Sequence, residues 1–159
     1  MKRKRKPFER RLDRLKDTLR RAGVRLTHQR LEIFREIAST GEHPDAESVY
    51  KRLKRRLPTV SLDTVYRNLW LLRDLGLIDT LGVANRSIRF DANMTPHHHF
   101  ICTVCGRTQD FHCLDFDRLR APKQAAILGR VEQTQVNFKG ICLKCESSRK
   151  RKRRGIIQP

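Results

Sequence analysis

Two cysteine pairs, each in a C-x-x-C pattern, constrain this chain more than any other feature. Cys102 and Cys105 form the first pair, Cys142 and Cys145 form the second, and 36 residues separate the two pairs. Four thiolates in this pattern can hold one tetrahedral zinc ion, whose binding free energy then contributes to folding. Because the interval is longer than in a short zinc ribbon, a folded segment must lie inside the loop. Disulfides or a redox-active pair are the alternatives, and Cys113 is by default a free structural cysteine.

The chain is strongly basic, with 36 Lys and Arg against 17 Asp and Glu, which gives a formal net charge of +19. Residues 2–6 carry five of these charges and residues 149–154 carry six. Such runs usually form disordered arms that track phosphates without sequence preference, and the alternative is a solvated tail. The excess favours a polyanionic partner, most often nucleic acid.

The sequence offers no support for a membrane or secreted protein. No apolar run approaches the roughly 20 residues that a bilayer-spanning helix needs. The basic start is followed by no apolar signal segment. We therefore expect a cytoplasmic protein with no membrane partner.

Apolar residues recur at helical spacing through the first half of the chain, beginning with residues 8–22. Thr27, Asp45 and Ser61 then stand where the N-caps of three further helices are expected. Gly76 is placed to end the last of these helices. Two short strands, at residues 77–81 and 87–90, are expected to follow around a turn at residues 82–86. Several helices followed by a hairpin predict a winged helix-turn-helix domain.

The fourth helix would be the recognition helix, which enters the major groove of DNA. Its polar positions are the candidate DNA-binding residues, namely Ser61, Thr64, Tyr66, Arg67 and Asn68. Arg67 or Asn68 can make bidentate contacts with bases. The alternative is that Tyr66 packs at the edge of the core and that Arg67 is a solvated charge.

From about residue 91 the chain becomes β-rich. Strands are expected at residues 100–102 and 107–111, and a helix across residues 114–128 that Pro122 interrupts or restarts. Val131, Val136 and Phe138 suit a further strand that leads to the second cysteine pair. The expected class is α+β, with an N-terminal winged helix-turn-helix domain followed by a β-rich second domain.

A run of three histidines, residues 97–99, indicates a second metal site. On a strand, side chains alternate, so His97 and His99 share a face and His98 points away. Asp91 and Asp110 are close enough to add oxygen ligands, and a mixed nitrogen and oxygen set suits Fe, Mn or Zn. The alternative is that the histidines form a solvated loop.

His43 lies in a Gly-Glu-His-Pro loop of the first half of the chain. A lone loop histidine is usually just exposed. If it instead binds the same ion as the later histidines, metal would set the angle between the two halves and so switch DNA affinity.

Taken together, these motifs resemble those of the ferric uptake regulator family of bacterial metal-dependent repressors. The resemblance runs from about Leu12 to Cys145. Its motifs are residues 23–30 (GVRLTHQR), 43–44 (HP), 64–69 (TVYRNL), 89–91 (RFD), 97–102 (HHHFIC) with 105–106 (CG), and 140–142 (GIC) with Cys145.

The resemblance implies a homodimer that binds a double-stranded DNA operator, with structural Zn²⁺ on the four paired cysteines. It implies a winged-helix DNA-binding domain at residues 8–90 and a metal-binding α/β dimerisation domain at residues 91–148. A basic arm at residues 1–7 and a basic tail at residues 149–159 flank these domains.

The peroxide-sensing branch of this family binds regulatory Fe²⁺ or Mn²⁺ through three histidines and two aspartates. The matching positions here are His43, Asp91, His97, His99 and Asp110. Asp110 is typical of this branch, because iron sensors usually carry Glu there. Iron and zinc sensors also commonly carry a histidine before the last cysteine pair, whereas residues 133–137 lack one.

The resemblance thus implies a repressor that senses peroxide through oxidation of a ligand histidine, His43 or His97. Because no step of this scheme requires catalytic turnover, we do not expect an enzyme. We expect no small organic substrate either. Regulation of iron or zinc uptake by the same fold is the alternative. Two other classes are a C-x-x-C oxidoreductase and a zinc protein that binds RNA or DNA without specificity.

Overall fold

The computed structural model describes residues 7–84 and 87–155, which form two compact units that divide between Met94 and Thr95. The division falls after the expected boundary at residues 90 and 91, so Asp91 belongs to the first unit. Pro7, expected in the basic arm, is the first residue of a helix. The rest of that arm, residues 1–6, lies outside the described part of the chain.

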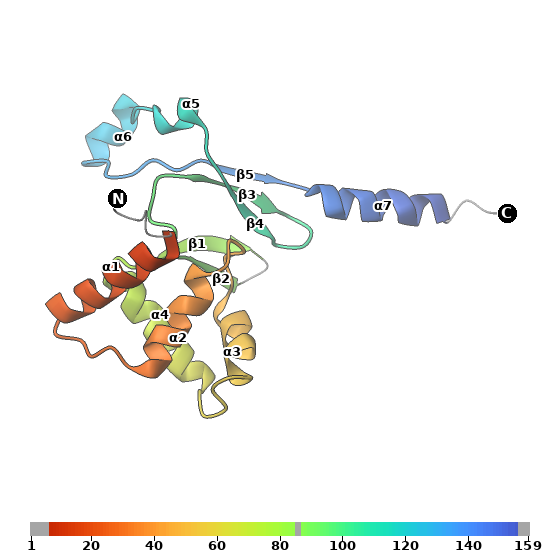
Figure 1. Ribbon diagram of the computed structural model, residues 1–159. Helices are drawn as coiled ribbons and strands as arrows, with labels where there is room; N and C mark the ends of the chain where they lie inside the picture. Colours follow the sequence, from red (N-terminus) through yellow and green to blue (C-terminus); the bar gives the residue numbers. More distant parts are fainter. Residues whose placement is uncertain (1–6, 85–86, 156–159) are drawn as a thin grey trace, which may run out of the picture. The chain divides into compact units, whose positions relative to one another are not determined.

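Four helices and a two-stranded hairpin make up the first unit (Figure 1). The elements are α1 (Pro7–Arg21), α2 (His28–Ala38), α3 (Ala46–Lys54), α4 (Leu62–Asp74), β1 (Asp79–Ala84) and β2 (Ser87–Asp91). Strands β1 and β2 pair antiparallel. Buried apolar side chains from all four helices and from β2 form one core. This order of helices and hairpin is that of a winged helix-turn-helix domain.

The predicted helix caps of the first unit are confirmed. The side chains of Thr27, Asp45 and Ser61 each accept a hydrogen bond from the backbone N–H three residues later. Gly76 adopts a positive φ of 64° after α4, and the next N–H, that of Leu77, donates to the Leu72 carbonyl. These contacts satisfy backbone groups that a helix end otherwise leaves unpaired.

The hairpin differs from the prediction in its bounds. Leu77 and Ile78 precede β1 and are buried in the helical core, because Leu77 closes the end of α4. Strand β1 instead continues to Ala84, and residues 85–86 of the predicted turn lie outside the described residues. Strand β2 extends to Asp91, which carries this candidate ligand into the hairpin.

The second unit is built on a three-stranded sheet of order β4-β3-β5 (Figure 1). Its strands are β3 (His98–Cys102), β4 (Thr108–Phe111) and β5 (Asn137–Gly140). Helices α5 (Leu114–Asp117) and α6 (Lys123–Leu128) connect β4 to β5, and α7 (Leu143–Gly155) follows β5. The register places His99 between Asp110 on the antiparallel strand and Asn137 on the parallel strand.

Three predictions for the second unit are corrected. The single helix expected at residues 114–128 is two short helices, because Pro122 has no N–H to donate and begins α6 as its N-cap. The last strand starts only at Asn137, not at Val131. The basic run at residues 149–154, expected as a disordered arm, continues helix α7 to Gly155. Within residues 7–84 and 87–155, none of the helices has the length and apolar character to cross a membrane.

Candidate metal centres

The four paired cysteines of the second unit converge on one point. Cys102 ends β3, Cys142 follows β5, and the Sγ atoms of all four lie within 4.8 Å of one another. All are free thiols, and the Cys105 and Cys142 Sγ atoms are 3.9 Å apart. A tetrahedral zinc ion with Zn–S bonds of about 2.3 Å separates its sulfurs by about 3.8 Å. The cluster therefore fits zinc, and Cys113 is outside it.

Contacts within the cluster shift the pKa values of Cys102 and Cys145 in opposite directions. Burial opposes ionisation of Cys102, but backbone N–H groups, that of Cys142 above all, outweigh it and lower the pKa of Cys102 to about 6. Hydrogen bonds with Cys142 and Cys105, together with burial, raise the pKa of Cys145 to about 12. A divalent metal bound here would favour the thiolate form of all four cysteines.

A second set of ligand atoms meets on the buried side of the same sheet. The Nε2 atoms of His97 and His99 are 2.9 Å apart. The Asp110 Oδ1 atom lies 3.8 Å from the first and 3.5 Å from the second. The predicted face-sharing of His97 and His99 is thereby confirmed. His98 points to the other side, where its Nε2 atom lies 3.1 Å from Asp117.

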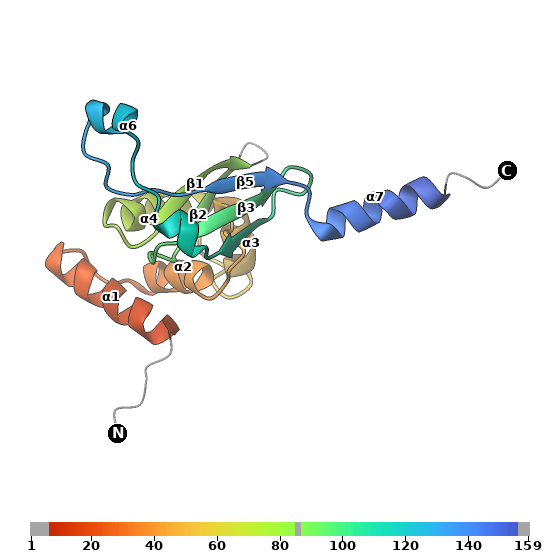
Figure 2. The same ribbon diagram turned by 90° about the horizontal axis from the view of Figure 1, so that it is seen from above.

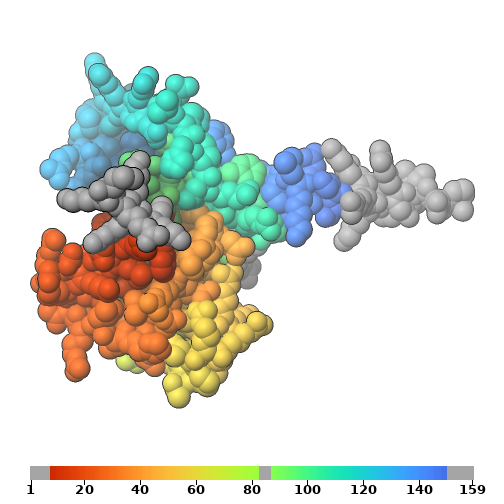
Figure 3. Space-filling view, viewed as in Figure 1, coloured from red at the N-terminus to blue at the C-terminus, as the bar shows by residue number. Residues whose placement is uncertain are grey.

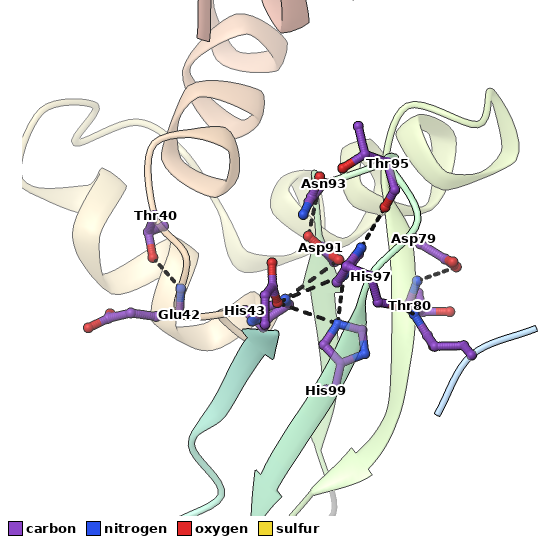
Figure 4. Close-up of polar contacts among 12 residues, drawn as sticks. Thr40, Glu42, His43, Asp79, Thr80, Asp91, Asn93, Thr95, His97 and His99 are labelled. Atoms are coloured by element: carbon purple, nitrogen blue, oxygen red, sulfur yellow. Dashed lines mark hydrogen bonds and ion pairs between the residues drawn. The ribbon is translucent and has the colours of Figure 1, made fainter. Parts of the chain in front are cut away.

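The hydrogen bonds of the Nδ1 atoms of His97 and His99 determine whether their Nε2 atoms can act as metal ligands. The Nδ1 atom of His97 lies 2.6 Å from the Thr95 carbonyl oxygen (Figure 4), and that of His99 lies 3.3 Å from the Asn137 Oδ1 atom. An N–H on each Nδ1 satisfies these acceptors and leaves a lone pair on each Nε2. Two lone pairs aimed at one point repel each other unless a cation lies between them, so this geometry fits a metal.

The sequence did not indicate Thr95 and Asn137 as partners of these histidines. Thr95 acts through a backbone carbonyl, which every residue carries, so no pattern identifies it. Asn137 reaches His99 only through the parallel pairing of β3 with β5. A register between strands 38 residues apart cannot be read from local spacing.

The first unit brings two further candidate ligands together. The His43 Nε2 atom lies 3.5 Å from the Asp91 Oδ2 atom, and both side chains are buried (Figure 4). The Phe90 N–H donates to the Pro44 carbonyl, which ties the His43 loop to β2. The other Asp91 oxygen accepts the N–H of Asn93 at 2.7 Å. His43 is therefore not the exposed loop histidine of the alternative.

The backbone at His43 is held in an uncommon conformation. Its φ is +50°, the left-handed region that residues other than glycine seldom adopt. The Arg89 guanidinium lies 3.5 Å from the His43 carbonyl oxygen and 3.8 Å from the Asp45 carboxylate. Arg89, which the sequence did not single out for this role, thus supports the ligand loop from β2.

Helix α4 presents part of its predicted DNA-binding set to solvent. Tyr66 is 40% exposed, and Arg67 pairs with Asp63 one turn away at 2.5 Å. The Ser61 and Thr64 hydroxyls lie 2.8 Å apart at the N-terminal end of the helix. These four side chains lie at the N-cap and in the first two turns of the helix.

Asn68 does not fit the predicted base contact. Its side chain is buried, its Nδ2 atom donates to the Thr64 carbonyl at 2.8 Å, and its Oδ1 atom accepts from Arg30 Nε at 3.0 Å. Both ends of the amide therefore serve the domain itself, joining α4 to α2. The hydropathy pattern could not distinguish this role from a base contact. An Asn whose amide bonds within the domain and an Asn exposed to solvent give the same polar position in the helix pattern.

Comparison with known proteins identifies the family. Residues 21–139 match the ferric uptake regulator family. The chain belongs to this family. The peroxide-responsive repressor PerR of Staphylococcus epidermidis is 36% identical over 129 residues, which cover 81% of this chain and 86% of that protein.

Solved structures of ferric uptake regulator family members share the fold. The Campylobacter jejuni peroxide stress regulator matches with a TM-score of 0.64 at 28% identity, covering 84% of this chain and 98% of that one. The Helicobacter pylori ferric uptake regulator Fur matches with a TM-score of 0.72 at 22% identity, covering 92% and 97%. The predicted α+β class, a helical N-terminal domain followed by an α/β domain, is confirmed.

Proposed function

We propose that this ferric uptake regulator family member is a metal-dependent transcriptional repressor that releases DNA when peroxide oxidises a ligand histidine. The observation that carries the proposal is the pair of His97 and His99 Nε2 atoms facing each other at 2.9 Å, with Asp110 beside them. The chain also shares 36% identity with a protein named as a peroxide-responsive repressor.

The regulatory site is proposed to join ligands from both units on one ion. The second unit supplies His97, His99 and Asp110, and the first supplies His43 and Asp91. Three imidazoles and two carboxylates suit Fe²⁺ or Mn²⁺ rather than a soft metal. A shared ion would fix the two units in an arrangement whose recognition helices fit successive major grooves of the operator, one from each subunit of a homodimer. The cysteine cluster is proposed to hold structural Zn²⁺.

Peroxide sensing follows from the imidazoles. Fe²⁺ bound by this set would supply the reducing chemistry that turns hydrogen peroxide into a short-range oxidant. The ring proposed to be oxidised is that of His43 or His97. It would gain one oxygen atom from hydrogen peroxide as the O–O bond breaks, and the other peroxide oxygen would leave as water. An oxidised imidazole is a poorer ligand, so the tie between the units is lost and DNA affinity falls. The chain turns over no organic substrate in this scheme, and we place it in the cytoplasm.

We propose that the exposed side of α4 recognises the base sequence of the operator DNA. Ser61, Thr64, Tyr66 and Arg67 would contact DNA, whereas Asn68 would hold α4 against α2. Arg67 would exchange its Asp63 partner for a base or a phosphate, since both offer acceptors to its guanidinium.

The test is binding to operator DNA selected from a random duplex pool by the Mn²⁺-loaded protein. We expect Mn²⁺ and Fe²⁺ both to support binding, and peroxide to abolish it only with Fe²⁺. Mass spectrometry of the Fe²⁺ sample should then find one added oxygen on His43 or His97. If no histidine gains oxygen but DNA binding still depends on the metal, the protein would instead be a regulator of metal uptake. Binding that follows salt but ignores both metals would contradict the whole scheme.

His43→Ala tests the tie between the units. The variant should keep its zinc content and lose metal-dependent DNA binding, because the first unit then lacks its nitrogen ligand. His28→Ala, at a histidine outside both clusters, is the matched control and should bind as the wild type does.

A further inference from the structure

Helix α7 carries a concentration of charge that neither metal centre nor the winged helix uses. Residues 149–154 are six consecutive Lys and Arg residues, and the helix backbone continues through them to Gly155. The helix extends away from the β4-β3-β5 sheet in both ribbon views (Figures 1 and 2). From Leu143 to Arg149 every side chain is exposed except that of Cys145, and this stretch stands clear of the sheet in Figure 3.

The composition of α7 indicates what kind of partner it can recognise. Leu143 is its single large apolar residue. A helix that docks into a protein groove or lies in a membrane interface needs an apolar face of several residues. Helix α7 has none, so its partner must be recognised by charge.

The start of α7 is fixed by the cysteine cluster. Cys142 precedes the helix, its N–H donates to Cys102 Sγ at 3.4 Å, and its carbonyl accepts the Glu146 N–H at 2.9 Å. Cys145 lies in the first helical turn. Helix α7 is therefore an extension that begins inside the candidate zinc site, and the position of its basic end follows from that of the second unit.

Electrostatics favours this helix at both ends. Four thiolates around Zn²⁺ carry a net charge of about −2, and they lie at the N-terminus, where the helix dipole is positive. The basic run lies at the opposite, negative end. Repulsion between cations one turn apart opposes the helix, and a bound polyanion would remove that cost.

The number of charges per unit length along this part of the helix axis is similar to that along the axis of duplex DNA. Six helical residues span about 9 Å, or about one positive charge per 1.5 Å, and duplex DNA carries about one negative charge per 1.7 Å. We propose that α7 is a second DNA-binding element, which contacts phosphates of duplex DNA without reading their sequence. The proposal rests on the proposed function, because it assumes that this chain binds DNA.

The experiment neutralises the run while preserving the helix. In one variant, Arg149, Lys150, Arg151, Lys152, Arg153 and Arg154 are all replaced by Gln, a good helix former. In the control, Arg149, Arg151, Arg153 and Arg154 become Lys, which keeps every charge. Fluorescence anisotropy measures binding of the full-length, zinc-loaded proteins to a random duplex of roughly 40 base pairs, at salt concentrations between about 50 and 200 mM.

An α-helix turns about half of its residues toward any one side, so we expect about three phosphates to be contacted per subunit. The Gln variant should then show a slope of log K against log salt that is shallower by about 3 per bound subunit, and binding more than tenfold weaker at about 100 mM salt. The Lys control should match the wild type. Zinc content and helical circular dichroism should be equal in all three proteins.

An unchanged slope in the Gln variant would overturn the proposal. So would a larger loss of affinity for single-stranded RNA, or for phosphatidylcholine vesicles with about one-fifth phosphatidylserine, than for the duplex. The random duplex requires no regulatory metal, so failure of metal-dependent operator binding would contradict the proposed function and leave this result standing. Normal metal response with an unchanged slope would contradict the α7 proposal alone.

Discussion

The Nε2 atoms of His97 and His99 face each other 2.9 Å apart, while their Nδ1 atoms are occupied by Thr95 and Asn137. This relationship gives both histidines the tautomer that a metal ligand requires before any metal arrives. It explains why a run of three histidines brings two candidate ligands, and not three, to one point. The middle residue, His98, is turned to the other side of the sheet, beside Asp117.

Replacing His99 by Ala should abolish the regulatory metal site while leaving the cysteine cluster loaded. Loss of a direct ligand should weaken Mn²⁺ binding by more than the roughly 10–100-fold that loss of an outer hydrogen-bond partner costs. Calorimetric titration of Mn²⁺ into the zinc-loaded protein measures the change. His28→Asn is the matched control, because His28 is exposed and outside the cluster. Equal weakening in both variants would show that the site lies elsewhere.

Replacing Cys142 by Ser should remove zinc and unfold the second unit. Zinc binding to four thiolates contributes about 10–16 kcal/mol in small zinc domains, and here it would hold the end of β3 to the residue after β5. A chromophoric chelator quantifies the zinc, and circular dichroism follows thermal unfolding. Cys113→Ser should retain zinc and unfold as the wild type does. A Cys142→Ser protein with full zinc content would refute the assignment of this ligand.

Asn68 and Arg67 are adjacent in sequence but should respond differently to substitution. Asn68→Ala removes the hydrogen bonds that the Asn68 amide makes with the Thr64 carbonyl and with Arg30 Nε, and it should destabilise the first unit by about 1–3 kcal/mol. Because the Arg67 side chain is 79% exposed, Arg67→Ala should change the free energy of unfolding by less than about 0.5 kcal/mol. The same substitution should weaken operator binding, since it removes a proposed DNA contact. Urea denaturation and anisotropy measure the two effects. The opposite pattern would restore Asn68 as a base-reading residue.

Asp45 should make the stability of the first unit depend on pH in the acid range. Burial raises the pKa of Asp45, but hydrogen bonds from Ser48 and the charge of Arg89 outweigh it and lower the pKa below its ordinary 3.8. Because the folded pKa is the lower one, the stabilisation is fully present above 3.8 and is lost as pH falls through the folded value.

Two substitutions separate the cap from the charge. Asp45→Ala should cost about 0.5–2 kcal/mol at neutral pH, whereas Asp45→Asn keeps a capping oxygen and should cost less. The stability difference between wild type and Asp45→Asn should move against the wild type as pH falls below 3.8, measured by urea denaturation. A difference that stays constant with pH would contradict the assigned direction.

The features of this protein that depend on local spacing could be predicted from the sequence alone. Thr27, Asp45 and Ser61 were recognisable as N-caps, because a cap bonds to an N–H only three residues away. The C-x-x-C pairs indicated one thiolate site, because each pair reaches a common ion on its own. The alternation of His97 and His99 followed from the two-residue period of a strand.

Tertiary structure decided everything that depends on pairing between distant segments. The register of β3 with β4 and β5 placed Asp110 and Asn137 on either side of His99. The tie between Pro44 and Phe90 brought His43 against Asp91, and contact between α2 and α4 turned Asn68 inward to Arg30. These outcomes depend on which long-range pairing buries the most apolar surface and satisfies the most polar groups. Neither the buried surface nor the hydrogen-bond partners of a pairing can be read from a single stretch of sequence.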